Sequence, residues 1–155
     1  MTMQGIGRVV EDLYALGFTA HTFAGNSQDA RYGYHLVLDI EECDPTQIDD
    51  PGAIRAWLRG WADRQPGLVQ QIGMTAHGEP HIESFAHDDP VTAGYTAVQL
   101  IETSSITAHF SPHLRTAHID VFSCRWFPPA VAVAHTLDTF GTMASKGHAT
   151  FLPRG

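Results

Sequence analysis

The side chains with the clearest chemical potential lie in residues 94–124, which read GYTAVQLIETSSITAHFSPHLRTAHIDVFSC. Ser104 is followed five residues later by His109 and twenty residues later by Cys124, and Thr96 precedes it by eight residues. A serine hydroxyl can act as a nucleophile, an imidazole as a general base and a thiol as an acid. Taken singly, these are equally a turn serine, a half-buried histidine, a core thiol and a strand threonine. Their combination therefore predicts a reactive site only if the spacing itself is meaningful.

At this spacing the segment resembles the core of the small bacterial-type S-adenosylmethionine decarboxylases, which are pyruvoyl enzymes made as a proenzyme. The ending DVFSC (120–124) is similar to the family's stretch around its cysteine. Upstream, YHLVLDIEECD (34–44) resembles the family's first strand, with His35, Cys43 and Asp44 in register. The resemblance covers about residues 33–153.

The resemblance implies that Ser104 attacks the carbonyl of Thr103 and that the chain is cut between these two residues. A pyruvoyl group made from Ser104 would then be the cofactor, with neither pyridoxal phosphate nor a metal. Such a carbonyl condenses with the substrate amine and takes up the electrons left by departing carbon dioxide. His109, expected on the neighbouring strand, would be the base in processing, and Thr96 would orient or protonate the oxygens of the intermediate. Cys124 would return a proton to the α-carbon.

Several positions depart from the family pattern. The family has Glu-Ser-His at the cleavage point, whereas this chain has Thr103-Ser104-Ser105. His113 stands where the family's glutamate holds the ribose hydroxyls, and a neutral imidazole cannot accept two hydrogen bonds as a carboxylate can. Pro90 stands near the position of the aromatic residue that stacks on adenine, which leaves Phe85 as the nearest candidate.

These departures indicate a changed substrate. We expect a decarboxylase of polyamine biosynthesis that acts on S-adenosylmethionine or, given the altered nucleoside-binding positions, on ornithine or arginine. A carboxylate for a distal cation would come from Glu102, Asp39 or Asp120. The candidate substrate-binding residues are Asp39, Glu102, His113 and Phe85. By resemblance, we expect a homodimer with its sites near the protomer interface.

Two other readings stay open at this point. The chain is alternatively an unprocessed, non-catalytic relative that serves as a binding or partner subunit. A thiol enzyme built on Cys124 is a third possibility, although thiol reactivity needs a lowered pKa that a sequence does not reveal. The G-x-S-x-G signature of serine hydrolases is absent. Lys146 is the only lysine, and nothing around it resembles a pyridoxal phosphate site.

The histidines do not predict a metal site. His77 and His81 are four residues apart, as are His109 and His113. This spacing brings two imidazoles together only on a helix, and helix is disfavoured by Gly78 and Pro80 inside the first segment and by Pro112 inside the second.

The elements that must position these residues follow from periodicity. Apolar residues at helical spacing predict helices at 4–17, from Pro51 to a stop at Pro66-Gly67, and from Pro129 to about Phe140. In the second helix, Ile54, Trp57, Leu58 and Trp61 form the apolar stripe, and Asp49 or Asp50 is the expected cap. Strands are expected at 34–40, 68–74, 81–85, 94–103, 105–110, 117–124 and 148–153, with a reversal around Thr103-Ser104-Ser105 and a loop at 22–32.

This order predicts an α+β fold: a two-layer α/β sandwich with a mainly antiparallel sheet and helices on one face. Residues 1–32 are expected to be an N-terminal extension, a short helix plus a loop, and residues 33–155 to be the S-adenosylmethionine decarboxylase-like domain.

Composition excludes several classes of protein. The 155 residues include 9 Lys plus Arg against 17 Asp plus Glu, a formal net charge of −8. This balance argues against binding nucleic acid or an anionic membrane, because neutralising phosphate requires clustered basic residues. No apolar run approaches the roughly 18 residues of a membrane span. With two cysteines and no signal peptide, we expect a cytoplasmic protein with reduced thiols.

Overall fold

The computed structural model describes residues 10–22, 32–62 and 73–155. Within these ranges the chain forms a seven-stranded sheet in the spatial order β1-β7-β2-β6-β5-β4-β3. The strands are β1 (Phe18–Thr22), β2 (Gly33–Glu41), β3 (His81–Phe85), β4 (Gly94–Ile101), β5 (Ser104–Ser111), β6 (Thr116–Ser123) and β7 (Lys146–Arg154). The helices are α2 (Pro45–Ile48), α3 (Pro51–Ala62) and α5 (Pro129–Phe140), and residues 10–15 are also helical.

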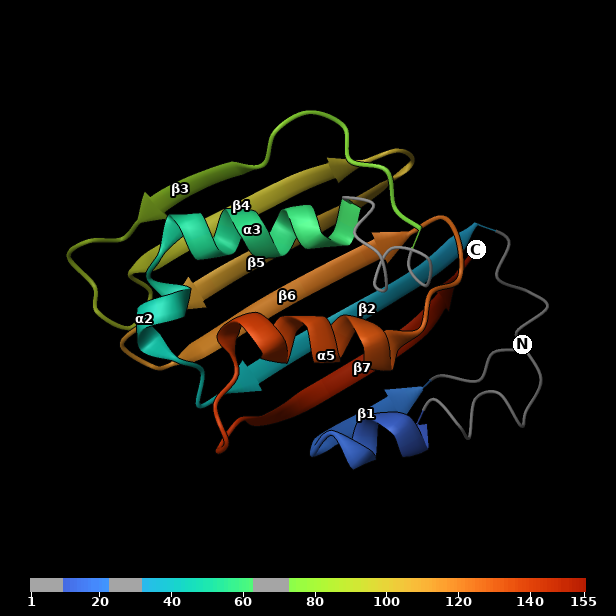
Figure 1. Ribbon diagram of the computed structural model, residues 1–155, viewed down its shortest axis with the longest axis horizontal. Helices are drawn as coiled ribbons and strands as arrows, with labels where there is room; N and C mark the ends of the chain where they lie inside the picture. The colour runs from blue at the N-terminus through green and yellow to red at the C-terminus, as the bar shows by residue number, and fades with distance from the viewer. Residues whose placement is uncertain (1–9, 23–31, 63–72) are drawn as a thin grey trace.

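Neighbouring strands are antiparallel except at one edge, where β1 pairs with β7 in parallel. The helices α2, α3 and α5 lie on the same face of the sheet (Figure 1). The predicted two-layer α+β sandwich with a mainly antiparallel sheet is therefore confirmed. The strand β1 was not predicted, and it brings residues 18–22 of the expected N-terminal extension into the same sheet.

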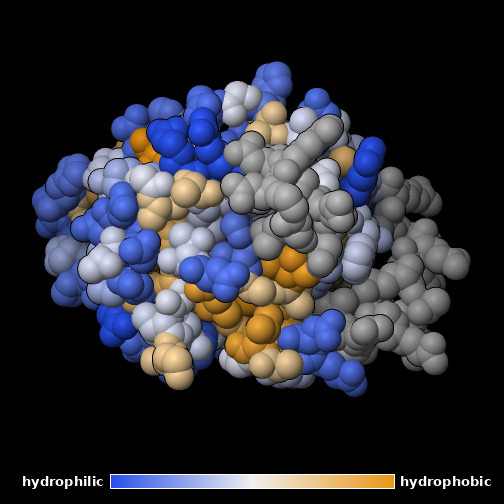
Figure 2. Space-filling model, in the orientation of Figure 1, coloured by the Kyte–Doolittle hydropathy of each residue, from blue (hydrophilic) through white to orange (hydrophobic). Residues whose placement is uncertain are grey.

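The core lies between this sheet face and the helices. Alternate residues of β2, namely Leu36, Leu38 and Ile40, are at most 1% exposed, whereas the residues between them are half-buried. This is the period-2 pattern of a sheet with one covered face. On the outer side of the helix layer, apolar side chains reach the surface around α5 while hydrophilic ones dominate the margins (Figure 2).

The helix α3 forms as its sequence predicts. The carboxylate of Asp50 accepts the N–H of Gly52 at 2.8 Å, and the carbonyl oxygen of Asp50 accepts the N–H of Ile54 at 3.0 Å. These contacts satisfy backbone donors that have no partner inside the helix. The predicted apolar stripe is fully buried: Ile54, Trp57, Leu58 and Trp61.

The two long helices meet closely at Gly60. A Cβ atom at this position would collide with the imidazole of His135 on α5. The Nε2 of His135 donates to the carbonyl oxygen of Trp57 at 2.9 Å, and the indole N–H of Trp57 donates to the Oγ1 of Thr136 at 3.2 Å. A glycine inside α3 thus permits an approach that two polar hydrogen bonds then fix.

The predicted strands at 34–40, 81–85, 94–103, 105–110, 117–124 and 148–153 are confirmed, with boundaries shifted by up to two residues. Residues 10–15 of the expected helix at 4–17 are helical. Most of the loop at 22–32, the helix end at Pro66-Gly67 and most of the strand at 68–74 lie outside the described residues. No described helix is long and apolar enough to cross a membrane.

The reversal between β4 and β5 begins earlier than predicted. Ile101 pairs with Ser104, so the turn consists of Glu102 and Thr103, and Ser104 is already the first residue of β5. Thr103 has a φ of 55°. This left-handed conformation is rare for a β-branched residue and is usually taken by glycine or asparagine. The backbone next to Ser104 is therefore strained.

Candidate active site

Two hydrogen bonds join Cys124, just beyond the end of β6, to the β4–β5 turn and to the first residue of β5. The N–H of Cys124 donates to the Oγ of Ser104 at 2.9 Å. The hydroxyl of Thr103 lies 2.9 Å from the Sγ of Cys124 and 2.7 Å from the carbonyl oxygen of Glu102. Because β5 and β6 form an antiparallel hairpin, the start of β5 lies beside the end of β6, next to Cys124. The structure therefore brings Thr103, Ser104 and Cys124 together.

The surroundings of Cys124 lower the pKa of its thiol. The main cause is the hydrogen bond from Thr103, followed by a contact with the Ser104 hydroxyl and the positive charge of Arg125, while desolvation acts in the opposite direction. The other cysteine behaves differently, because burial raises the pKa of Cys43 to about 12. Only the thiolate is a good nucleophile, so Cys124 is the reactive thiol of the two.

A cavity of about 170 Å³ opens beside this cluster. Its lining includes Ser104, Cys124 and Thr103, and the charged residues Glu102 and Arg125 also belong to it. A cavity at the end of a strand, with a hydroxyl and a thiol in its wall, has room for a small polar molecule next to both groups.

A second polar pair lies on β4 and β5. The Nε2 of His109 is 3.1 Å from the carbonyl oxygen of Thr92, and its Nδ1 is 2.9 Å from the Oγ1 of Thr96. A carbonyl oxygen only accepts, so these partners assign the ring hydrogen to Nε2 and leave Nδ1 as the acceptor of the Thr96 hydroxyl. His109 is thus oriented to take a proton from, or through, Thr96.

This pair is far from Ser104 within one chain. The prediction that His109 lies on the neighbouring strand is wrong. His109 lies on the same strand as Ser104, five residues further along β5. At ~3.3 Å per residue, the two positions are about 17 Å apart. A single chain therefore carries two separate groups of candidate residues at opposite ends of β5.

The candidate substrate-binding residues divide between these two ends. Glu102 lies at the Ser104 end and lines its cavity. Phe85 pairs with Gly94 at the start of β4, and His113 lies in the turn that follows β5, so both belong to the His109 end. Asp39 belongs there too, because its partner in register, His118, lies directly opposite His109.

The face of the sheet opposite the helices carries a polar row. Thr96, His109, His118, Asp39 and His148 are consecutive register partners across β4, β5, β6, β2 and β7. The Nδ1 of His118 lies 2.6 Å from a carboxylate oxygen of Asp39, and both side chains are about half exposed. None of the described helices covers this face (Figure 1), and His118 and His148 of the row are exposed.

The histidine pairs considered for metal binding lie in non-helical segments, as predicted. His81 and His109 are on strands, and His113 is in a turn. Within residues 10–22, 32–62 and 73–155, no three His, Cys, Asp or Glu side chains are arranged to hold a metal ion.

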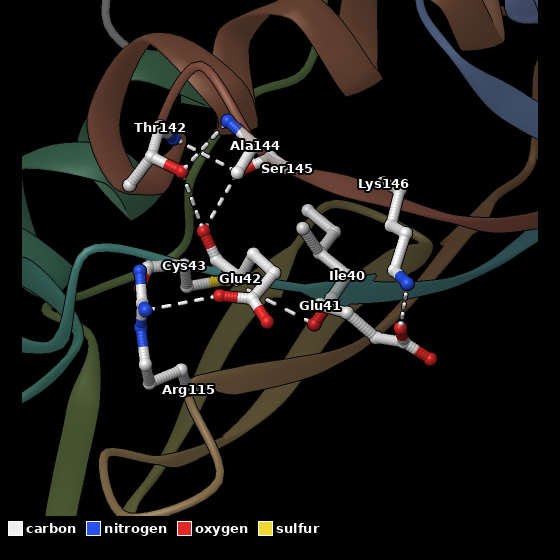
Figure 3. Close-up of polar contacts among 9 residues, drawn as sticks. All are labelled: Ile40, Glu41, Glu42, Cys43, Arg115, Thr142, Ala144, Ser145 and Lys146. Carbon is white, nitrogen blue, oxygen red and sulfur yellow. Dashed lines mark hydrogen bonds and ion pairs between the residues drawn. The ribbon is translucent and has the colours of Figure 1, made fainter.

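Cys43 belongs to a structural cluster at the end of β2, shown in Figure 3. The carbonyl oxygen of Glu42 accepts the hydroxyls of Thr142 at 2.8 Å and Ser145 at 3.0 Å. Arg115 binds the Glu42 carboxylate at 2.9 Å and donates to the carbonyl oxygen of Cys43 at 3.1 Å. These contacts fasten the end of β2 to the β5–β6 turn and to the loop before β7.

Residues 34–155 match the sequence model of a family described as S-adenosylmethionine decarboxylase. The chain belongs to the S-adenosylmethionine decarboxylase family. The resemblance noted in the sequence is thereby confirmed, and the family match includes both groups of candidate residues.

Individual relatives agree with this family assignment. An S-adenosylmethionine decarboxylase proenzyme of Pyrococcus furiosus is 28% identical over 124 residues, which are 79% of this chain and 78% of that protein. A proenzyme of the same name from Parasynechococcus marenigrum is 28% identical over 92 residues, which are 59% of this chain but only 62% of that protein. The crystal structure of the adenosylmethionine decarboxylase from Aquifex aeolicus has the same fold, with a TM-score of 0.59 and 23% identity over 80% of this chain and 91% of that chain.

Sequence reasoning missed two features of the candidate site. Arg125 lines the cavity and directly follows Cys124, so its position in the sequence was the available signal. The carbonyl oxygen of Thr92 fixes the tautomer of His109, and it lies in a loop whose backbone path has no sequence signature.

Proposed function

We propose that the chain is a proenzyme that cuts itself between Thr103 and Ser104 and then acts as a pyruvoyl-dependent amino-acid decarboxylase of polyamine biosynthesis. One observation carries this proposal: the strained residue is the one whose carbonyl carbon Ser104 must attack. A left-handed conformation costs an ordinary L-residue about 1–2 kcal/mol. Opening the Thr103–Ser104 peptide bond releases this strain, because Thr103 is no longer held in a closed hairpin turn.

The hydrogen bond to Ser104 favours the first step. The N–H of Cys124 donates to the Ser104 Oγ and so stabilises the negative charge that develops on this oxygen when a base takes the hydroxyl hydrogen. The Oγ adds to the carbonyl carbon of Thr103, and the C–N bond breaks to give an ester with a free amino group on Ser104. Loss of the α-proton then breaks the Cβ–O bond and releases Thr103 as a carboxylate. Water replaces the nitrogen of residue 104, which leaves as ammonia.

The pyruvoyl group formed at position 104 would supply an electrophilic carbonyl that accepts the electrons of the departing carboxylate. The residues around Ser104 fit such a group, because the cavity opens at Ser104 and the thiol of Cys124 adjoins it. Cys124 would return a proton to the substrate α-carbon. Its exposure and its lowered pKa are consistent with a thiol that exchanges protons readily.

The base for processing would come from a second copy of the chain. The Thr96–His109 pair is at the wrong end of β5 to reach Ser104 of its own chain. A two-fold interface is isologous, so a partner whose β5 runs antiparallel brings its own His109 end to the first Ser104, and the reverse. The accessible sheet face is a surface over which two chains can stack in this way. We therefore propose a homodimer in which each site combines residues of both chains.

Glu102 supports a substrate with a cation away from its α-carboxylate. It lies in the cavity beside Ser104, and cleavage adds the new carboxylate of Thr103 nearby. S-adenosylmethionine, with its sulfonium, and the side chains of ornithine and arginine all meet this requirement. His113 lacks the paired acceptors that suit ribose hydroxyls. For this reason we propose ornithine and arginine as candidate substrates alongside S-adenosylmethionine.

The intact mass of the purified protein tests the proposal. We expect two fragments split before residue 104, whereas the Ser104→Ala chain stays whole and the Ser105→Ala chain is still cut. Borohydride reduction in the presence of labelled S-adenosylmethionine, ornithine or arginine should attach one of them to the C-terminal fragment and so identify the substrate. A wild-type chain that stays whole under all conditions would overturn the proposal in favour of a non-catalytic binding or partner subunit.

A further inference from the structure

The side-chain hydroxyl of Thr103 contacts both the thiol of Cys124 and the backbone of Glu102. Thr103 is the residue on the far side of the bond to be cut, and its hydroxyl lies between two groups. One is the Sγ of Cys124 at 2.9 Å, and the other is the carbonyl oxygen of Glu102 at 2.7 Å. A hydroxyl has one hydrogen and two lone pairs, so it can serve both neighbours but can donate to only one at a time.

This arrangement suits both protonation states of Cys124. When the sulfur is a thiolate, the Thr103 hydroxyl donates to it, because a charged acceptor binds a donor more strongly than a neutral one. When the sulfur is a thiol, its S–H can donate to the Thr103 oxygen while the Thr103 hydrogen turns to the carbonyl oxygen of Glu102. Rotation of one hydroxyl therefore accommodates a proton that arrives at or leaves the sulfur.

We propose that Thr103 is a positioning residue for Cys124, whose hydroxyl holds the Sγ beside Ser104 and reverses its hydrogen bond as the thiol gains or loses its proton. This inference concerns the uncut chain, in which the closed turn holds Thr103 beside Cys124, and it rests on the proposed function for the place of Cys124 in the reacting site. It gives the scissile residue a second task that its side chain, and not its carbonyl group, performs. The lowered pKa of Cys124 agrees with it, since the hydroxyl of Thr103 is the largest cause of that shift.

The reactivity of Cys124 tests this role in a chain that cannot be cut. In the Ser104→Ala background, the rate of alkylation by iodoacetamide is measured against pH and read as the mass gained by the protein. The buried Cys43, with a pKa of about 12, provides an unreactive internal reference. Thr103→Val removes the hydroxyl but keeps a β-branched residue in the turn, and Thr103→Ser keeps the hydroxyl.

We expect the Thr103→Val chain to be alkylated at neutral pH roughly threefold to tenfold more slowly than its parent, with its pH profile moved to higher pH. This is the effect of losing a donor to a thiolate that is partly exposed to solvent. The Thr103→Ser chain should keep the parent profile. An unchanged profile for Thr103→Val would overturn the proposal, and so would an equal shift in both variants, which would show that packing and not the hydroxyl matters.

The outcome is independent of self-cleavage. A wild-type chain that is never cut would overturn the proposed function and leave the Thr103–Cys124 result standing. Conversely, if the wild-type chain is cut but the alkylation profile of the Thr103→Val chain is unchanged, only the role of Thr103 is overturned.

Discussion

Ser104 and His109 lie on the same strand, at opposite ends of β5, and about 17 Å separates them. Each is fixed by a local partner, Ser104 by the N–H of Cys124 and His109 by the hydroxyl of Thr96. A strand is too stiff to fold back over five residues, so motion of one chain does not bring the two together. The proposed self-cleavage therefore requires two chains for each site.

Mixed dimers provide a direct test of this requirement. A Ser104→Ala chain keeps His109, and a His109→Ala chain keeps Ser104, so one complete site forms when the two chains pair. We expect neither variant to be cut alone, whereas the His109→Ala chain is cut after co-expression with the Ser104→Ala chain. Tags of different mass on the two chains show by mass spectrometry which of them is cut.

The control for this experiment pairs the His109→Ala chain with a chain that carries both substitutions. This pair contains no intact His109 and should not be cut. Cleavage of the His109→Ala chain on its own would contradict the role of His109, and failure of the mixed dimer to cut would contradict the shared site.

The strain at Thr103 leads to a prediction about both stability and cleavage. In the uncleavable Ser104→Ala background, the Thr103→Gly chain should have a free energy of unfolding about 1 kcal/mol higher than the Thr103→Ala chain, because both lack the hydroxyl and only glycine adopts a positive φ without a steric penalty. In the otherwise wild-type chain, Thr103→Gly should slow cleavage, since less strain is released. Urea denaturation measures the first effect, and the time course of the intact mass measures the second.

Ala86 offers a matched control for this strain, because it has a φ of 57° in the turn after β3. Ala86→Gly should stabilise the chain to a similar extent and leave the cleavage rate unchanged. Thr103→Val, which keeps the β-branch and loses the hydroxyl, should cleave faster than Thr103→Gly. Equal rates for wild type and Thr103→Gly would show that strain does not drive the reaction.

The parts of the fold that the sequence predicted are those governed by local periodicity. The stripe of Trp57 and its helical neighbours requires a buried face, and the alternation in β6 requires a half-buried strand. The short edge strand β1 escaped prediction because five residues that pair in parallel with β7 have no local pattern that distinguishes them from a loop. Its place depends on a partner more than a hundred residues away.

The candidate site was predictable to a similar degree. The proximity of Ser104 and Cys124 follows from an antiparallel hairpin, whose register fixes which residues face each other. The positive φ of Thr103 was not predictable, because threonine disfavours that conformation and only the surrounding hairpin imposes it. The separation of Ser104 from His109 follows only once both are known to lie on one strand, since the turn precedes Ser104.

Stability should depend on pH through His135. Burial between α3 and α5 lowers the pKa of this imidazole below 6.5, although the carbonyl oxygen of Trp57 and the charge of Asp138 act in the opposite direction. The unfolded chain therefore binds a proton more readily than the folded chain, and the free energy of unfolding falls as the pH drops below about 6.5. One such group changes this free energy by at most about 1.4 kcal/mol per pH unit.

Urea unfolding of the Ser104→Ala chain and of the same chain with His135→Gln isolates this contribution. Other groups titrate equally in both chains, so the difference between their unfolding free energies should shrink as the pH falls from 7.5 to 5. A difference that does not vary with pH would show that His135 is not held neutral by the fold.

Gly60 provides a prediction that opposes helix propensity. Gly→Ala in the interior of a helix normally stabilises it by about 1 kcal/mol. At this position the added Cβ would collide with the imidazole of His135, which is itself held by the carbonyl oxygen of Trp57. Displacing this ring breaks the partly buried hydrogen bond between α5 and α3. We therefore expect Gly60→Ala to lower the free energy of unfolding by roughly 1–3 kcal/mol.

In a His135→Ala background the imidazole is absent, and Gly60→Ala should stabilise the chain. Urea unfolding of the four members of this double-mutant cycle measures both effects. If Gly60→Ala has the same effect in both backgrounds, the close approach of the two helices does not explain the glycine.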